Sequence, residues 1–226
     1  MSNITNTITE NITLLESDIK KACKYAGVDD AHPKIIAVSK RQDPNRITEA
    51  LNAGLRIFGE NQVQEASQRW PELRSQYDGI ELHLIGGLQS NKTAEAVALF
   101  DVIESVDREK IARSIARECQ KQDRHPDIYI QVNTGEEPQK GGVLPTDLDS
   151  LVQCVRDELS LPLVGLMAIP PTDDDPAMHF ALLKKLSKRH NLERLSMGMS
   201  SDFALAASMG ATDIRVGTAI FGDRKY

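Results

Sequence analysis

The run IIAVSK, residues 35–40, places a lysine directly after a short apolar stretch. A lysine at the end of a buried strand often snorkels, which means that its stem covers apolar surface while its ammonium reaches water. An amine that is withdrawn from water instead loses its proton more easily, and it then forms a Schiff base with a carbonyl compound. Position alone leaves both interpretations of Lys40 open.

Two segments nearer the C-terminus combine glycine with hydroxyl side chains. They read LSMGMSSD (195–202) and RVGTAIFG (215–222), and each begins with a short run that is typical of a strand. Free backbone N–H groups in such turns can hold a phosphate dianion without a patch of basic side chains. An ordinary tight turn with a Ser or Thr cap explains either segment alone, but the pair favours a phosphate site.

These residues need a scaffold that brings the ends of several strands together. Strand-like runs alternate with helix-like stretches after residue 34, which predicts a parallel sheet. No GxGxxG follows the first run, which counts against an open dinucleotide-binding sheet. We therefore expect an α/β fold, a single (β/α)8 TIM barrel, with its active site where the strands end. The predicted strands are 35–39, 55–58, 82–85, 102–104, 128–132, 163–167, 195–197 and 214–216.

Helix signals fill the intervals. An amphipathic helix is predicted within residues 1–27, before a barrel that spans 34–226, so that 1–226 forms one domain. Asp43 as N-cap and Pro44 at the first helical position predict a helix directly after Lys40. The apolar face of the first helix contains Ile4, Ile8, Ile12, Leu15, Ile19 and Ala22. A further helix after Asp107 carries the stripe Ile111, Ala112, Ile115, Ala116 and Cys119.

The composition excludes several classes of function. The chain has 226 residues, 40% of them hydrophobic, and a formal net charge of −6, which suits a globular protein and argues against a nucleic-acid partner. The three cysteines and five histidines lack the spacing of metal ligands, so neither a disulfide framework nor a metal site is expected. No signal-peptide pattern or membrane-spanning stretch is present, which predicts a cytoplasmic protein.

Six motifs occur in order after residue 34. They read AVSK, FGENQVQEA, HLIGGLQSNK, GLMAIPP, LSMGMSSD and RVGTAIFG, and together they closely resemble the YggS/PROSC family of pyridoxal-phosphate-binding homeostasis proteins. The resemblance implies a barrel of the alanine racemase N-terminal-domain type with an extra N-terminal helix. It also implies that Lys40 carries pyridoxal 5′-phosphate as an internal aldimine. Gly87 stands where the family usually has proline, which would loosen the loop after the third strand.

Positions that match the family motifs imply further cofactor-binding residues. Asn61 would lie beside the cofactor ring, and Arg215 would face the pyridine nitrogen. His83 either lines the pocket or is a structural histidine. The phosphate-binding residues would be Ser200, Gly217 and Thr218, with a backbone contact from Met199.

Arg215 determines the expected chemistry. Pyridoxal phosphate withdraws electrons strongly when its pyridine nitrogen is protonated, and a permanently cationic guanidinium disfavours that proton. Racemases with this barrel tolerate an arginine, but they use a tyrosine base supplied through a second domain, which this chain is expected to lack. We therefore predict a cofactor-binding protein of vitamin B6 and amino-acid homeostasis without substantial catalysis. The expected partners are pyridoxal-phosphate-dependent apoenzymes, and the expected state is a monomer.

Other functions fit parts of the sequence. A fold-type III pyridoxal-phosphate enzyme, such as an amino-acid racemase or decarboxylase, would need a base that the motifs do not reveal. A Schiff-base aldolase acting on a sugar phosphate would need a carboxylate near Lys40, for which Glu60 is the candidate, and it leaves Arg215 unexplained. A scaffold with a vestigial site is the remaining alternative.

Overall fold

A closed barrel of eight parallel strands forms the centre of the computed structural model, which describes residues 7–28 and 32–222. The strands pair in sequence order, and β1 closes the ring by pairing with β8. The predicted (β/α)8 barrel is therefore confirmed. The strands are β1 (Lys34–Val38), β2 (Ile57–Glu60), β3 (Glu81–Leu84), β4 (Val102–Val106), β5 (Asp127–Val132), β6 (Leu163–Ala168), β7 (Arg194–Ser196) and β8 (Asp213–Val216).

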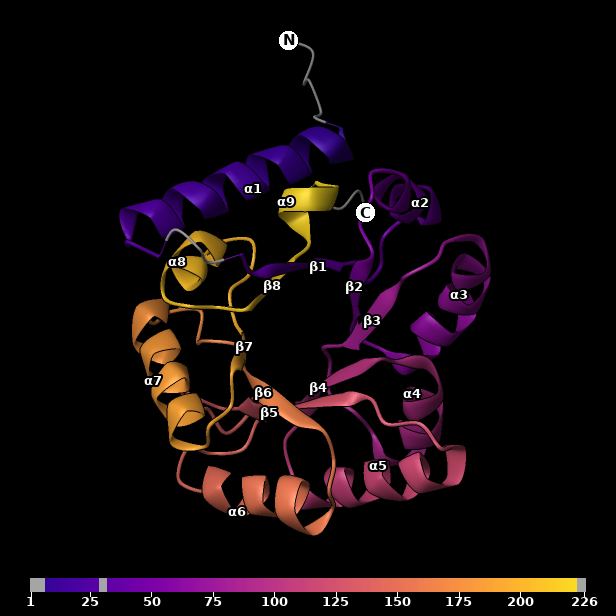
Figure 1. Cartoon of the computed structure of the whole chain (residues 1–226), viewed down its shortest axis with the longest axis vertical. Coiled ribbons are helices and arrows are strands. Elements are labelled where there is room, and N and C mark those ends of the chain that lie inside the picture. Colours follow the sequence, from indigo (N-terminus) through magenta and orange to yellow (C-terminus); the bar gives the residue numbers. More distant parts are fainter. Residues whose placement is uncertain (1–6, 29–31, 223–226) are drawn as a thin grey trace.

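Helices surround the barrel as an outer ring (Figure 1). One of them, α1, precedes the first strand and packs along α8 and α9 at the end of the chain. The helices are α1 (Ile8–Tyr25), α2 (Pro44–Asn52), α3 (Val63–Gln76), α4 (Thr93–Leu99), α5 (Glu109–Gln122), α6 (Leu148–Val152), α7 (Pro176–Arg189), α8 (Phe203–Ser208) and α9 (Thr218–Phe221), with the short turns η1 (Ser90–Lys92) and η2 (Gln153–Glu158).

The first helix follows its sequence signals over the described residues. It begins with a capping box, in which Thr7 and Glu10 satisfy each other's backbone N–H groups. Its buried residues include Ile8, Leu15 and Ile19 from the predicted apolar face. Residues 1–6 of the predicted helix, with Ile4, lie outside the described ranges.

The helix after Lys40 also begins where the sequence indicates. The side chain of Asp43 accepts a hydrogen bond of 2.8 Å from the N–H of Asn45, and Pro44 is the first residue of α2. An N-cap of this type contributes about 1 kcal/mol. Its position fixes the start of α2 four residues after Lys40. The predicted stripe on α5 is buried as well.

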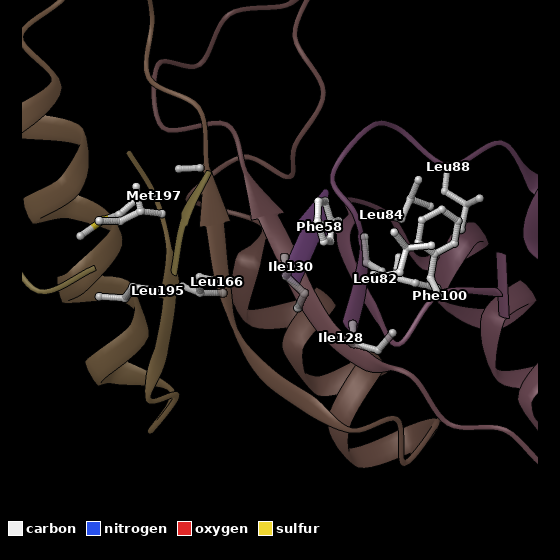
Figure 2. Close-up of a cluster of buried hydrophobic side chains, with 14 of the residues drawn as sticks. Phe58, Leu82, Leu84, Leu88, Phe100, Ile128, Ile130, Leu166, Leu195 and Met197 are labelled. Atoms are coloured by element: carbon white, nitrogen blue, oxygen red, sulfur yellow. The ribbon is translucent and has the colours of Figure 1, made fainter. Parts of the chain in front are cut away.

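Apolar side chains on the outer face of the strands pack against the helices. Figure 2 shows Leu82 and Leu84 of β3 gathered with Leu88 and Phe100, and all four are buried. Each buried leucine contributes about 1.5–3 kcal/mol, so this packing holds the strands and helices together. A second group in the same view consists of Leu166, Leu195 and Met197.

The inner face of the barrel carries polar side chains. The Oγ of Ser196, on β7, lies 2.5 Å from Oε2 of Glu104, on β4. The hydroxyl oxygen of Tyr129, on β5, lies 2.8 Å from Oδ2 of Asp213, on β8. Neither pair of strands is adjacent in the sheet. The two side chains of each pair must therefore meet inside the barrel.

No helix within residues 7–28 and 32–222 is long and apolar enough to cross a membrane. The description of 1–226 as one domain stays a prediction, because the described ranges leave out both ends of the chain.

Candidate functional site

The mouth of the barrel lies where the strands end, and most of the predicted site residues are there. Lys40 follows β1, and Asn61 follows β2. The predicted phosphate-binding residues follow β7 and β8, and β8 pairs with β1. These residues are Met199, Ser200, Gly217 and Thr218.

Lys40 is half-buried in a turn that is held on both sides. The hydroxyl of the preceding Ser39 is buried and donates to Glu60 Oε1 at 2.7 Å. The N–H of the following Arg41 donates to Glu65 Oε1 at 2.8 Å. Arg41 has a φ of 55°, which is unfavourable for a non-glycine residue and persists only where the surroundings enforce it. Contacts from β2 and α3 thus hold the turn that carries Lys40.

The carboxylate of Glu60 lies behind this turn, between β2 and α3. Besides the Ser39 hydroxyl, its Oε1 accepts hydrogen bonds from Arg69 Nη1 at 2.9 Å and Trp70 Nε1 at 3.1 Å. Burial raises the pKa of Glu60, although these hydrogen bonds and the charge of Arg69 act in the opposite direction. Because the carboxylate faces α3, it is badly placed for the acid–base role that the aldolase alternative requires.

Two adjoining cavities open at the ends of the first three strands. The smaller, of about 190 Å³, includes Lys40 in its lining, and the larger, of about 420 Å³, includes Lys92. Asn61 and Gln62 line both cavities. The smaller is completed by Arg41 and Glu65, and the larger by Val63, Gln64, Gly86, Gly87 and Gln89.

Asn61 is held in place by the loop after β3. A Cβ atom on Gly86 would lie 2.2 Å from the carbonyl oxygen of Asn61, so only glycine fits at this position. The side-chain Oδ1 of Asn61 is buried and accepts no hydrogen bond within the described ranges. A buried acceptor without a donor is costly, and Asn61 therefore offers an unsatisfied polar contact to a ligand beside Lys40.

The segment after β7 lies beside β8, because the N–H of Arg215 donates to the carbonyl of Gly198 at 3.1 Å. The backbone N–H groups of Ser200 and Gly217 have no acceptor in the part of the chain that the structure describes. The N–H of Met199, in contrast, donates to Asp202 Oδ1 at 2.5 Å. The N–H groups of Ser200 and Gly217 are thus free among the described residues, while that of Met199 is occupied.

Arg215 is a buried cation with a fixed orientation and is 3% exposed. Its Nη1 donates to Ser196 Oγ at 2.6 Å and its Nη2 to the carbonyl of Ala168 at 2.8 Å. The Ser196 hydroxyl donates in turn to Glu104. Burial lowers the pKa of the Arg215 guanidinium, but an arginine stays protonated throughout the ordinary pH range.

His83 is fully buried inside the barrel and lines neither cavity. Its Nδ1 lies 2.6 Å from Glu104 Oε1, and its Nε2 lies 2.8 Å from Glu81 Oε1. Burial opposes protonation, but hydrogen bonds to the two carboxylates outweigh it and raise the pKa of His83 to about 9. Of the two roles that the sequence leaves open, this geometry favours the structural histidine.

A second polar cluster lies at the opposite end of the barrel from the mouth. The hydroxyl of Tyr129 donates to Asp213 Oδ2 at 2.8 Å, and Nη2 of Arg194 donates to Asp213 Oδ1 at 2.7 Å. Burial raises the pKa of Tyr129, so its hydroxyl remains a donor. These side chains satisfy one another's hydrogen bonds and close the end of the barrel that lies opposite the mouth.

Sequence reasoning missed the interior residues. Glu104 is the last residue of a predicted strand and Asp213 directly precedes another, and a charged residue beside or within an apolar strand is a signal of an interior partner. The partner itself could not be read from the sequence, since Glu104 and Ser196 are 92 positions apart. Within the described residues, no group of three or more His, Cys, Asp or Glu side chains could hold a metal ion.

Comparisons with known proteins place the chain in a sequence family. Residues 12–225 match the sequence family described as the N-terminal domain of alanine racemase. The chain is 42% identical to the pyridoxal phosphate homeostasis protein of Pseudomonas aeruginosa, covering 98% of this chain and 97% of that protein. It is 37% identical to the protein of the same name from Aquifex aeolicus, covering 96% and 98%.

A solved structure has the same fold at appreciable sequence identity. PipY of Synechococcus elongatus is 36% identical, and the match covers 95% of this chain and 100% of that chain. The TM-score is 0.84 for the PipY structure without pyridoxal phosphate and 0.80 for the structure with it bound.

Proposed function

Because the chain belongs to the family of the pyridoxal phosphate homeostasis proteins, we propose that it binds pyridoxal 5′-phosphate at the barrel mouth and serves vitamin B6 homeostasis. The observation that carries this proposal is the cavity shared by Lys40 and Asn61. It combines a half-buried amine with a buried acceptor that lacks a donor. A small polar aldehyde suits such a site.

The residues at the mouth fit each part of this cofactor. Pyridoxal phosphate supplies an aldehyde that condenses with amines and a ring that withdraws electrons. Lys40 offers the amine for covalent attachment, and Asn61 offers its Oδ1 beside the ring. The free N–H groups of Ser200 and Gly217 are donors for the phosphate, together with Thr218, the first residue of α9.

The geometry supports the predicted cofactor contacts of Met199 and His83 less well. The N–H of Met199 is occupied by Asp202, so a backbone contact from Met199 to the phosphate would require Asp202 to move. His83 has both ring nitrogens engaged by carboxylates, and we assign it to the support of the site rather than to cofactor contact.

Arg215 argues for a carrier more than for an enzyme. Its guanidinium holds its own proton and is fixed by Ser196 and Ala168, so it would keep the pyridine nitrogen of the cofactor unprotonated. This weakens the stabilisation of carbanions, which racemases and transaminases need. The relatives are named homeostasis proteins, which is consistent with this role. We further propose a cytoplasmic monomer that passes the cofactor to apoenzymes.

The test is an absorption spectrum of the purified protein after incubation with pyridoxal phosphate, before and after borohydride reduction, followed by peptide mass mapping. We expect a visible band that reduction abolishes and a modification at Lys40. The variant Lys40→Ala should lose the modification, whereas Lys92→Ala, in the neighbouring cavity, should keep it. A protein that stays colourless, or one modified equally in the Lys40→Ala variant, would contradict the proposal.

An amino-acid racemase is the second candidate, because the matching sequence family is described as the N-terminal domain of alanine racemase. The cofactor-loaded protein should be incubated with single enantiomers of amino acids, and the products should be separated by chiral chromatography. Turnover that disappears in Lys40→Ala would favour the racemase. Absence of turnover, with the cofactor attached, would support the carrier.

A further inference from the structure

The helix α9 is too short to be stable by itself. It contains four residues, Thr218–Phe221, and directly follows Gly217. Isolated helices of this length do not form in water. The proposed function nevertheless assigns Gly217 and Thr218 to the cofactor phosphate. The geometry of these two residues must therefore depend on contacts from outside α9.

Two side chains from the beginning of the chain hold the other end of α9. Nδ2 of Asn11, on α1, donates to the carbonyl of Ile220 at 2.9 Å. Nη2 of Arg46, on α2, donates to the carbonyl of Phe221 at 2.9 Å. The last carbonyls of a helix have no donor within the helix, so Asn11 and Arg46 satisfy the groups that α9 leaves unpaired. A cation at this end also suits the helix dipole.

Arg46 is itself held, and the helices that carry Asn11 and Arg46 are tied to each other. Nη1 of Arg46 forms a salt bridge of 2.8 Å with Glu49 Oε2, and Glu49 Oε1 accepts a hydrogen bond of 3.3 Å from the N–H of Ile8. Ile8 is fully buried at the start of α1. Figure 1 shows α1 lying across α9, with α2 beside it. Glu49 thus ties the two helices that carry Asn11 and Arg46.

We propose that Asn11 and Arg46 are positioning residues that set the affinity of the site for the phosphate group of its ligand. The inference rests on the proposed function, because it takes Gly217 and Thr218 as phosphate contacts. Arg46 lies in the helix that begins four residues after Lys40. It therefore also fixes the spacing between the amine and the phosphate contacts.

The test compares two ligands that differ only in the phosphate, pyridoxal 5′-phosphate and pyridoxal. Dissociation constants should be measured by absorbance for the wild-type protein, Asn11→Ala and Arg46→Met. We expect each variant to bind pyridoxal 5′-phosphate about two- to tenfold more weakly, the range for one lost hydrogen bond. Binding of pyridoxal should not change. Arg46→Lys, which keeps a charged donor, should restore part of the loss.

Thr13→Ala is the matched control on α1. Its hydroxyl donates only within the helix, to the carbonyl of Thr9, and the residue is exposed. Amide hydrogen exchange of the cofactor-free protein adds a second readout, because the N–H groups of Ile220, Phe221 and Gly222 close the turn of α9. Exchange at these three amides should be faster in Asn11→Ala than in Thr13→Ala.

The outcomes separate the inference from the proposed function. A wild-type protein that prefers pyridoxal 5′-phosphate, with variants that keep the same preference, would overturn the positioning role alone. Equal weakening of both ligands would also overturn it, since that result indicates general destabilisation. A wild-type protein without preference for the phosphorylated ligand would overturn the phosphate site, and the inference with it.

Discussion

Glu104 and Arg215 face each other inside the barrel, with 3.8 Å between Glu104 Oε2 and Arg215 Nη1. The other oxygen of the same carboxylate lies 2.6 Å from Nδ1 of His83. One fully buried carboxylate therefore serves two cations. A buried charge is tolerated only beside a group of opposite charge. Removal of the Glu104 carboxylate therefore leaves both cations uncompensated.

Glu104→Gln should destabilise the fold strongly. The substitution keeps the shape of the side chain but leaves His83 and Arg215 without their shared anion, and the expected loss is about 3–5 kcal/mol. Urea unfolding measures it. Glu109→Gln, which breaks an exposed pair with Arg113, is the control and should cost about 1 kcal/mol or less. Equal losses in the two variants would contradict the shared role of Glu104.

His83→Gln should change the pH dependence of stability. The pKa of His83 in the folded protein, about 9, exceeds its ordinary value of 6.5. The charged ring therefore contributes fully below pH 6.5, and this contribution is lost as the pH rises through 9. Unfolding free energies of wild type and variant should converge over this interval, at about 1.4 kcal/mol per pKa unit. If the unfolding free energies of the two proteins differ by the same amount at every pH, His83 is neutral in the folded protein.

Substitution by alanine should have opposite effects on stability at Gly86 and Gly87. A Cβ atom on Gly86 would collide with the backbone of Asn61, whereas nothing lies within 4 Å of the corresponding position on Gly87. Gly86→Ala should weaken cofactor binding and lower the melting temperature. Gly87→Ala should preserve binding and add about 0.4–1 kcal/mol of stability, because it restricts the unfolded chain. If both variants bind normally, Gly86 does not position Asn61.

Arg69→Met should disturb the support of Lys40. Arg69 donates to Glu60 Oε1 at 2.9 Å, to Glu65 Oε1 at 3.1 Å and to the carbonyl of Ser39 at 3.2 Å. Without it, the buried Glu60 would hold its proton more tightly in the folded state. The loss of stability relative to the wild type should therefore grow as the pH rises through the raised pKa of Glu60 in the folded wild-type protein.

Urea unfolding of Arg69→Met at acidic and neutral pH measures this effect, with Arg113→Met as an exposed control. We expect a loss at neutral pH on the order of 3–5 kcal/mol, and a smaller one in acid. A loss that does not depend on pH would mean that Glu60 is already neutral in the wild-type protein.

Local signals in the sequence were sufficient for the scaffold. Lys40, at the end of an apolar run, and Asp43, before a proline, are found where periodicity and capping indicate. Alternation of strands and helices fixes the barrel, and in a barrel the mouth follows from the strand ends. The predicted second strand begins two residues early, at Leu55, because ladder pairing, which the sequence does not display, determines where β2 starts.

Contacts across the barrel were not predictable in the same way. His83 lies on its predicted strand. Its two carboxylate partners depend on how far β3 is staggered against β4 and on which face each residue occupies. The clamp on α9 is a further example, since Asn11 and Ile220 are 209 residues apart. Such pairs follow from closure of the ring, which no local pattern encodes.

Closure between β1 and β8 has a consequence for synthesis on the ribosome. Ile35 pairs with Ile214, and Ala37 pairs with Val216, so the edge of the first strand has no partner until the eighth strand has been translated. The roughly 180 residues between Lys40 and Thr218 take about 10–35 s at the usual elongation rates. During that interval one edge of β1 is unpaired, and the chain still lacks the segments after β7 and β8 that we assign to the phosphate. Under the proposed function, the cofactor can therefore be captured only after β8 has closed the ring against β1.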